Sequence, residues 1–293
     1  MGIMDWIFNG SGPKVEKFLD GSRQKITLIS KQTLSRDSYL LRFDLNNPNY
    51  VLGLPIVKHI RFYCPNQTGK VEGYWNGKPT DTTSTEISRK YTPISKQSDK
   101  GYVDFVIKMY LPMEDGPYVD GGKMSRYLHN LTIGDELEID GPVGMSEYLG
   151  KGKFFSKGHE FSRFKIGMIA GGSGITPFYQ LIQAILNDPS EDNVTLSLLY
   201  ANQSENDILL KEELDTFQKL HPDKFKVAYT VDKADNKWQQ YVGYVNEKMI
   251  SETLPAPSDD TAIFFCGPPP MVEKAIMPSV RNLGYNMDYV MKL

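Results

Sequence analysis

The chain has 293 residues, of which 40% are hydrophobic and 24% charged, with a formal net charge of −3. This length suits two domains, each with its own core. The composition is typical of globular proteins, and the nearly balanced charge gives no reason to expect nucleic-acid binding. The only cysteines, Cys64 and Cys266, are too few for a disulfide framework and fit a reducing, intracellular setting.

No stretch approaches the roughly 18 apolar residues needed to cross a bilayer, so we expect no transmembrane span in this chain. The apolar N-terminal stretch 1–9 lacks the basic segment and the length of a signal peptide. Trp6 stands where a myristoylation signal requires Ser or Thr. Within an N-terminal tail over 1–21, we interpret this stretch as a frayed end rather than a weak membrane-surface anchor. A peripheral position on the cytoplasmic face of the endoplasmic reticulum or mitochondrial outer membrane stays open.

Residues 22–150 have the pattern of a β domain. In 38–45 and 102–111, hydrophobic and polar side chains alternate with the two-residue period of a strand. Many short strands separated by turn residues predict a small antiparallel β-barrel. The polar stretch Cys64–Ser88 contains a hairpin signal, Asn76-Gly77, and we interpret it as a long surface loop or excursion.

Residues 151–163 are rich in Gly, Lys and Ser, and we expect them to link the barrel to a second domain over 164–293. In the second domain, helical patterns separate short apolar runs, which lie at 165–170, 194–200, 225–231 and 262–266. Strands that alternate with helices predict a doubly wound parallel sheet.

Two motifs in the first domain have the chemistry of a flavin and pyrophosphate site. Arg89 offers a planar fork of donors for a phosphate, Tyr91 offers a flat ring, and Thr92 offers a hydroxyl beside a proline. The later Gly-Gly-Lys-Met-Ser motif would form a second anion site from Lys123, Met124 and Ser125. Lys108 lies with Val106 on the more polar face of its strand, where it either contacts an anionic cofactor or is simply solvated.

Glycine-rich motifs mark the carboxyl ends of strands in the second domain, where open α/β sheets bind ligands. The loop that holds Gly172, Ser173 and Gly174 precedes a helix whose N-terminus can bind phosphate, although it could also be a plain tight turn. Cys266 begins a Cys-Gly-Pro-Pro-Pro-Met motif. Its thiol could be a nucleophile, but a buried thiol that packs against a ring is favoured because nothing nearby in sequence activates it.

Asp232 follows the third apolar run of this domain. It could bind ribose hydroxyls and repel a 2′-phosphate, or it could be an exposed loop residue. The four histidines, including His59, lie in unrelated contexts without metal-ligand spacing, so no metal site is expected.

Taken together and in this order, the motifs resemble the NADH–cytochrome b5 reductases of the ferredoxin–NADP reductase superfamily. The resemblance implies an FAD-binding antiparallel β-barrel followed by an NAD-binding α/β doubly wound parallel sheet. By the family pattern, Arg89 and Ser125 hold the FAD phosphates, aided by Lys123 and Met124. Tyr91 would lie against the flavin, and Thr92 would hydrogen-bond near the hydride-accepting N5 atom. The remaining residues implied at the FAD site are Val106, Lys108 and Thr176.

The resemblance also implies that NADH lies over Gly172, Ser173 and Gly174. Asp232 would stand near the adenosine ribose and Tyr244 near the adenine. The residues implied to shape the nicotinamide pocket are Cys266, Gly267, Pro268 and Met271, and Thr92 and Cys266 are the candidate catalytic residues. The implied reaction is hydride transfer from NADH to FAD, followed by single-electron transfer to cytochrome b5 or a similar haem protein.

Alternative functions keep the same chemistry with a quinone, an oxygenase or another haem module as acceptor, or describe a flavin-free binding module. The sequence departs from the family pattern at Ser173, which replaces the commoner Thr, and at Lys90, which replaces a common Pro. The Cys64–Ser88 excursion is longer than in the family, and the C-terminus lacks the Phe that often ends its members.

Overall fold

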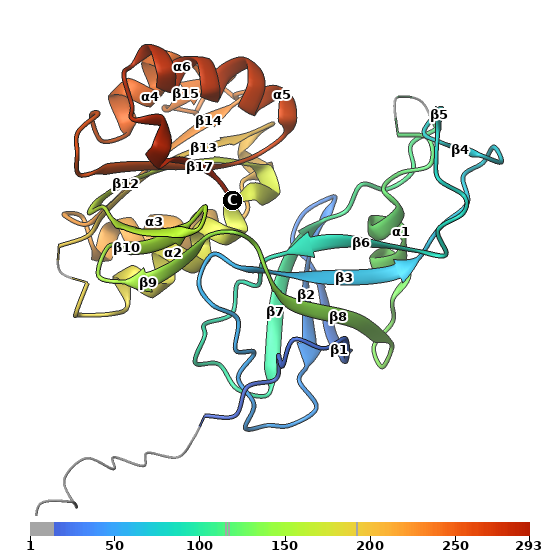
Figure 1. Ribbon diagram of the computed structural model, residues 1–293. Helices are drawn as coiled ribbons and strands as arrows, with labels where there is room; N and C mark the ends of the chain where they lie inside the picture. The colour runs from blue at the N-terminus through green and yellow to red at the C-terminus, as the bar shows by residue number, and fades with distance from the viewer. Residues whose placement is uncertain (1–14, 115, 117, 192) are drawn as a thin grey trace, which may run out of the picture.

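The structure is a computed structural model that describes residues 15–114, 116, 118–191 and 193–293. The N-terminal stretch 1–9 lies outside the described residues. Two domains lie side by side, an antiparallel sheet domain and a parallel sheet covered by helices on both faces (Figure 1). Among the described residues, no helix is long and apolar enough to cross a membrane.

The first domain is a six-stranded antiparallel sheet in the order β6-β3-β8-β1-β2-β7. Its core is aromatic at the centre, where the ring of Phe62 lies 4.8 Å from that of Phe105 and 6.1 Å from that of Phe43. The expected antiparallel barrel is therefore confirmed. The elements of this sheet are β1 (Gln24–Thr33), β2 (Ser38–Asp44), β3 (His59–Pro65), β6 (Glu86–Tyr91), β7 (Tyr102–Lys108) and β8 (Glu136–Val143), and the helix is α1 (Lys123–Asn130).

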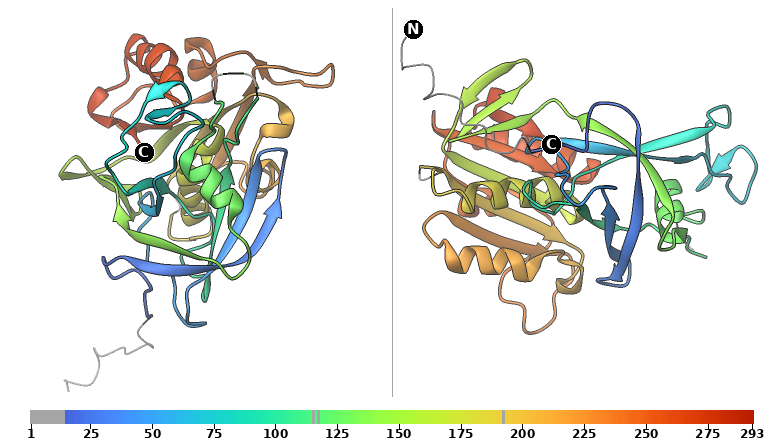
Figure 2. Two further views of the ribbon diagram at one scale, coloured as in Figure 1. Left: turned by 90° about the vertical axis from the view of Figure 1, so that its right-hand side faces the viewer. Right: turned by 90° about the horizontal axis from the view of Figure 1, so that it is seen from below.

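The Cys64–Ser88 excursion forms a small hairpin from β4 (Tyr74–Trp75) and β5 (Lys78–Pro79). The two turn residues, Asn76 and Gly77, have φ angles of 49° and 72°. Two successive positive φ values match the twist of a hairpin, and Asn-Gly is the pair that adopts them most readily. The hairpin signal is thus confirmed, and the hairpin projects from the barrel on the side away from the second domain (Figures 1 and 2).

The segment between the domains is more ordered than the linker that its composition predicts. It contributes β10 (Lys153–Ser156) and β11 (His159–Ser162), which form a three-stranded antiparallel sheet with β9 (Glu147–Gly150). Phe154 and Phe161 are buried in the core of the second domain. Their rings lie 5.6 Å apart, so aromatic burial holds the segment in place.

The second domain is a six-stranded parallel sheet in the order β15-β14-β13-β12-β16-β17, as the strand–helix alternation predicts. Its strands are β12 (Lys165–Gly171), β13 (Thr195–Asn202), β14 (Phe225–Val231), β15 (Tyr241–Val242), β16 (Thr261–Cys266) and β17 (Val290–Lys292). Its α-helices are α2 (Thr176–Leu186), α3 (Lys211–Leu220), α4 (Glu247–Thr253), α5 (Pro269–Met271) and α6 (Met277–Asn282). A π-helix covers Val272–Ile276, and short 3-10 helices cover Gly172–Ile175, Glu205–Asp207 and Met287–Tyr289.

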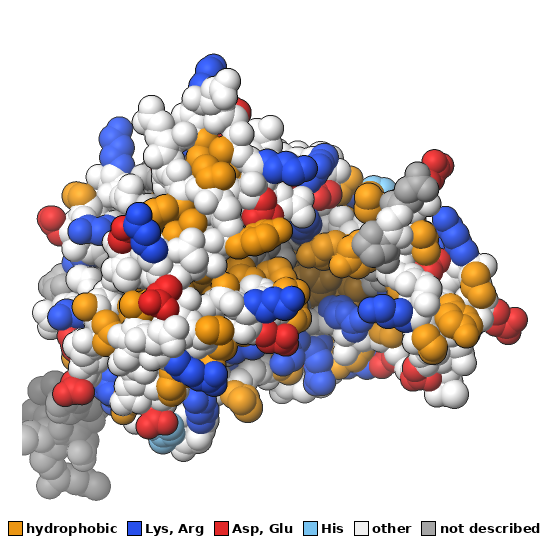
Figure 3. Space-filling model, turned by 90° about the horizontal axis from the view of Figure 1, so that it is seen from above, with side chains coloured by type: hydrophobic (Ala, Val, Ile, Leu, Met, Phe, Trp, Pro, Cys, Tyr) orange, Lys and Arg blue, Asp and Glu red, His pale blue; other side chains and the backbone are white. Residues whose placement is uncertain are grey.

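The two domains meet at a buried seam. Ile56, Val57 and Val106 of the barrel belong to the same hydrophobic cluster as the core of the second domain. The backbone N–H of Val57 donates to Oε1 of Gln180 in α2 at 2.8 Å. The face of β7 that carries Val106 is therefore covered by the second domain rather than by solvent. Seen from above, a hollow with a hydrophobic floor lies between the domains, with Lys and Arg side chains nearby (Figure 3).

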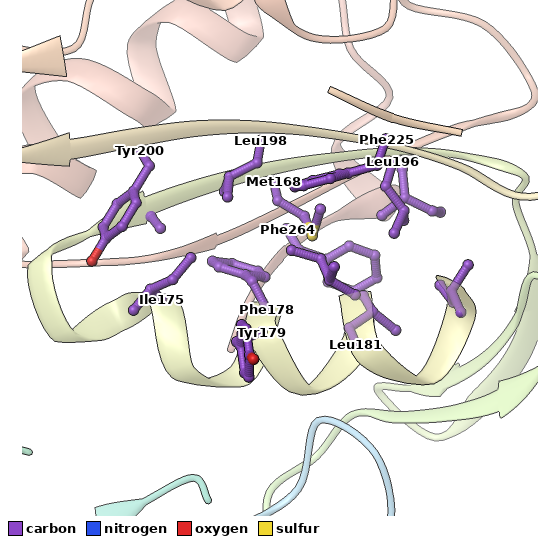
Figure 4. Close-up of a cluster of buried hydrophobic side chains, with 14 of the residues drawn as sticks. Met168, Ile175, Phe178, Tyr179, Leu181, Leu196, Leu198, Tyr200, Phe225 and Phe264 are labelled. Atoms are coloured by element: carbon purple, nitrogen blue, oxygen red, sulfur yellow. The ribbon is translucent and has the colours of Figure 1, made fainter. Parts of the chain in front are cut away.

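Helix α2 presents its apolar face to the sheet. Phe178 and Leu181 pack against Met168, Leu198 and Phe264, which come from three neighbouring strands (Figure 4). Residues three apart share one face of a helix, so the apolar spacing in 178–186 produces this packing directly. The cluster fixes the start of α2, and with it the glycine loop, against the seam.

Candidate functional site

The site begins at the seam, where strand β3 starts and strand β6 ends. Ile60 pairs with Tyr91 in the antiparallel register, so His59 stands opposite Thr92. The Nδ1 atom of His59 lies 2.7 Å from the Oγ1 atom of Thr92. Thr92 is itself buried.

His59 is neutral at physiological pH. Burial, together with the positive charges of Lys90 and Lys58, lowers the pKa of its imidazole to about 4. Its hydrogen bond to Thr92 is therefore formed by a neutral ring. Sequence reasoning missed His59, because the only signal for it is the pairing register between two strands that lie thirty positions apart.

Tyr91 and Arg89 lie on the same side of β6, two residues apart. The Tyr91 ring packs on that of Phe62, with centroids 4.5 Å apart and planes at 34°. Burial raises the pKa of the Tyr91 hydroxyl above its usual value, so the phenol stays neutral. Arg89 is exposed, and one of its five N–H donors is used in a bond to the backbone carbonyl of Ser88 at 2.7 Å.

The N-terminus of α1 supplies a second set of donors. Gly122 precedes the helix and provides no side-chain cap, so no side chain takes up the N–H groups of the first turn. Ser125 and Met124 are buried in that turn. The Nζ atom of Lys123 donates to two uncharged oxygens, in Asn66 and Thr80, at 2.6 and 3.1 Å. Backbone donors, a hydroxyl and an ammonium together suit a phosphate.

The two glycine motifs of the second domain pack directly on each other. A Cβ atom on Gly174 would lie 2.3 Å from the carbonyl oxygen of Cys266, and one on Gly171 would lie 2.8 Å from the sulfur of Met271. A Cβ atom on Gly171 would also lie 2.9 Å from Cδ of Pro268 and 3.3 Å from Cα of Gly267. Gly172 has a φ of 53° and open space beside it. This is a backbone-lined cradle that only glycine allows, and it fits a flat ring or a phosphate.

Thr176 starts α2 at the edge of this cradle. It is buried, and its hydroxyl donates to the carbonyl of Ser173 at 3.3 Å. Cys266 lies at the carboxyl end of β16, and burial raises the pKa of its thiol to about 11. The thiol is thus protonated at neutral pH. This agrees with a packing role and argues against a nucleophilic thiolate.

Asp232 and Tyr244 lie together at the carboxyl edge of the sheet. The backbone N–H of Asp232 donates to the carbonyl of Asn202, and that of Gly243 donates to Val231. These bonds bring the Tyr244 turn next to the end of β14. Asp232 is exposed, and Tyr244 has 80% of its surface exposed. An exposed aromatic ring beside a carboxylate fits the adenosine half of a dinucleotide.

Lys108 is not simply solvated, since its side chain is half-buried and ion-paired, and its contact with FAD stays a prediction. Its Nζ atom lies 2.7 Å from Oδ2 of Asp37 and 3.9 Å from Oδ1 of Asp207. The guanidinium of Arg36 lies 3.2 Å from the same Asp207 oxygen. Asp207 belongs to the second domain and the other three belong to the barrel, so Lys108 is part of an ion-pair cluster that joins the domains.

The two halves of the site share one hydrophobic cluster. Ile94, two residues after Thr92, packs against it from the barrel together with Val106. Ile175 and Cys266 belong to it or pack against it from the parallel sheet. The backbone N–H of Ile94 donates to the carbonyl of Asp104 in β7, and β7 contacts the Gly172–Ile175 turn of the second domain. The barrel edge that carries Thr92 and the Gly174–Cys266 cradle therefore meet at one seam. The Lys123–Ser125 turn lies beside the hairpin excursion, and the Asp232–Tyr244 pair lies at the sheet edge.

Comparisons with known proteins agree with this division of the chain. Residues 25–148 match the family model of an oxidoreductase FAD-binding domain, and residues 168–276 match that of an oxidoreductase NAD-binding domain. The chain is 40% identical to NADH-cytochrome b5 reductase 3 of Rattus norvegicus, over 95% of this chain and 89% of that protein. It is also 40% identical to nitrate reductase [NADH] 1 of Zea mays, over 92% of this chain and 42% of that protein.

Among solved structures, the cytochrome b5 reductase domain of Ulva prolifera nitrate reductase superposes with a TM-score of 0.84 at 33% identity. The match covers 94% of this chain and 99% of that domain. The phosphate-compatible turn of α1, the glycine cradle and the seam between them fit the two cofactors that these family models bind. The chain belongs to the NADH-cytochrome b5 reductase family of FAD- and NAD-binding oxidoreductases.

Proposed function

We propose that this protein oxidises NADH through bound FAD and passes single electrons to cytochrome b5 or a similar haem protein. The proposal is supported by the packing of the two domains against each other at the seam. Ile94 and Val106 of the FAD-binding domain and Cys266 of the NAD-binding domain pack against one cluster. Hydride transfer requires the reacting atoms to come within about 3–3.5 Å, and a shared seam is where the two cofactors can meet at that distance.

The residues of the chain bind, orient and exclude water. FAD, when bound, supplies a ring that accepts hydride and gives up electrons one at a time. The neutral His59 holds the Thr92 hydroxyl in a fixed orientation at the edge of the barrel. The Gly174–Cys266 contact fixes one wall of the nicotinamide pocket. The buried side chains of the seam keep water from that pocket.

Positive charge around the flavin site supports a haem-protein acceptor with an acidic surface. Arg89 and Lys90 are exposed on β6 beside Tyr91. Lys96, Lys151 and Lys153 are exposed elsewhere on the surface. Exposed charges of one sign speed the encounter with a partner of the opposite sign, and this effect weakens as salt is added. The relatives named above as cytochrome b5 reductases support the same acceptor.

The decisive experiment follows electrons in two steps. The purified protein, loaded with FAD, is mixed with NADH without oxygen, and loss of the oxidised flavin absorbance is recorded. The reduced protein is then mixed with oxidised cytochrome b5, a quinone or ferricyanide. We expect rapid bleaching by NADH and faster reduction of cytochrome b5 than of the quinone, with a rate that falls as salt rises.

Two results would contradict the proposal at different levels. A protein that takes up no FAD, or whose flavin NADH does not bleach, would be a binding module rather than a reductase. A protein whose flavin bleaches but which reduces the quinone and not cytochrome b5 would keep the NADH–FAD chemistry and lose the proposed acceptor.

A further inference from the structure

The hairpin excursion is tied to the loop that leads into α1. Oδ1 of Asp120 accepts the backbone N–H of Lys70 at 2.7 Å, and Oδ2 accepts that of Asn76 at 2.6 Å. The Asn76 side chain returns the contact, since its Oδ1 accepts the N–H of Asp120 at 2.7 Å. Asp120 is 3% exposed, so these bonds are shielded from water.

The excursion also takes up the next carbonyl of the same loop. The oxygen of Gly121 accepts from Nε1 of Trp75 at 2.8 Å and from Nδ2 of Asn76 at 2.9 Å. Gly121 has a φ of 70°, and it lies so close to the backbone of Tyr110 that a Cβ atom would reach its carbonyl oxygen at 2.7 Å. The sequence Gly-Gly would be conformationally free by itself. Here five hydrogen bonds join the excursion to Asp120 and Gly121, three of them through the loop backbone, and they order the N-terminal side of the turn.

Lys123 is positioned by the same excursion without being neutralised. Its two hydrogen-bond acceptors, in Asn66 and Thr80, are uncharged. Its Nζ atom lies 5.0 Å from the ring centroid of Trp75, and the Arg126 guanidinium lies 5.3 Å from the same centroid. A ring face and neutral oxygens hold an ammonium in place, and its positive charge stays available for an anion.

We propose that the excursion pre-organises the diphosphate-binding turn at the start of α1, with Asn76 and Trp75 as positioning residues for tight retention of FAD. This rests on the proposed function and on the placement of the FAD phosphates at Lys123–Ser125 that the family resemblance implies. A loop that is ordered before binding loses less conformational entropy when the ligand arrives, and the saving appears as slower release. The excursion therefore acts on cofactor affinity although its hairpin projects away from the seam.

The test compares FAD release from holoenzyme variants, followed by the rise of flavin fluorescence after dilution. Asn76→Gly removes both side-chain hydrogen bonds and keeps a residue that tolerates the φ of 49° found there. We expect FAD to leave about tenfold faster, as for the loss of two neutral hydrogen bonds. Trp75→Phe removes the Nε1 bond and keeps a smaller aromatic face for Lys123, and we expect about a threefold effect.

Two controls separate positioning from general loosening. Thr83→Ala lies in the same excursion and breaks only a local bond to Asp81, so its release rate should equal that of the wild type. Protein reconstituted with riboflavin, which lacks the phosphates, should release it at the same rate with or without Asn76→Gly. Thermal midpoints of the FAD-saturated variants confirm that they are folded.

The inference is overturned if Asn76→Gly and Trp75→Phe both release FAD at the wild-type rate, or if Asn76→Gly speeds riboflavin release as much as FAD release. In either case the proposed function stands as long as the wild-type protein holds FAD. A wild-type protein that holds no FAD overturns both.

Discussion

The Nδ1 atom of His59 and the Oγ1 atom of Thr92 lie 2.7 Å apart, so a side-chain hydrogen bond joins the ends of β3 and β6 next to the seam. At neutral pH this bond is made by an uncharged imidazole. Burial and two neighbouring lysines disfavour the charged ring, so protonation of His59 at low pH opposes folding.

We expect His59 to make the protein less stable in acid. The ordinary pKa of a histidine side chain is about 6.5, and the pKa of His59 in the folded protein is about 4. Between these values the unfolded chain binds a proton at His59 and the folded chain does not, so stability falls as the pH falls. The expected loss is about 2 kcal/mol, because partial solvent access reduces the full effect of the shift.

The measurement is denaturant unfolding at neutral pH and near pH 4.5, for wild type and His59→Asn. Asn can still hydrogen-bond Thr92 and does not titrate, so it should lose less stability over this range. Other carboxyl groups titrate in both proteins and cancel in the comparison. Parallel loss of stability in the two proteins would show that His59 does not titrate as we infer.

The Gly174–Cys266 contact predicts a steric effect on NADH binding. In Gly174→Ala the new Cβ would lie 2.3 Å from a backbone carbonyl oxygen, which cannot move away as a side chain could. We expect a loss of about 1–3 kcal/mol in stability and a raised KM for NADH, measured by unfolding and steady-state kinetics. Ser173→Ala, which adds no atom in the same loop, should leave stability within about 0.5 kcal/mol of wild type. Equal behaviour of the two variants would contradict the close packing.

Local patterns predicted much of this architecture. The alternation around Phe105 predicted a barrel strand, and the Asn76-Gly77 pair predicted the hairpin. The spacing after Phe178 predicted the buried face of a helix. Each of these signals lies within a few residues of sequence. The motif that holds Gly174 was found because a close backbone approach demands glycine.

Features that depend on contacts between distant segments were not predicted. The role of His59 depends on strand register, and the ion pairing of Lys108 depends on a carboxylate from the other domain. The composition of 151–163 suggested a linker and gave no sign that the segment also forms two strands, with Phe154 and Phe161 buried in a core. Burial of two aromatic side chains in a neighbouring core can hold a segment in strands although its other residues favour turns.

We expect the ion-pair cluster between the domains to stabilise the protein through Asp207. Its side chain is 6% exposed and lies within 3.9 Å of both Arg36 and Lys108. In Asp207→Asn the two cations lose a shielded partner, and we expect a loss of about 2 kcal/mol in stability, with weaker dependence on salt. Glu160→Gln breaks an exposed pair with Lys153 and should cost at most about 0.5 kcal/mol. Equal losses measured by chemical unfolding would contradict an energetic role for the cluster.

We expect Asp232 to determine the choice between NADH and NADPH. Asp232 is exposed at the end of β14, beside the turn that carries the 80%-exposed Tyr244. A carboxylate at this place favours ribose hydroxyls and repels a 2′-phosphate, so removing its charge should remove the repulsion. In Asp232→Ala, the ratio of kcat/KM for NADPH to that for NADH should rise about tenfold or more. Asp235→Ala is the matched control, because that exposed carboxylate caps the local backbone at Lys237 and should leave the ratio unchanged. If Asp232→Ala leaves the ratio as it is, or if Asp235→Ala raises it as much, the selectivity does not come from a carboxylate at the end of β14.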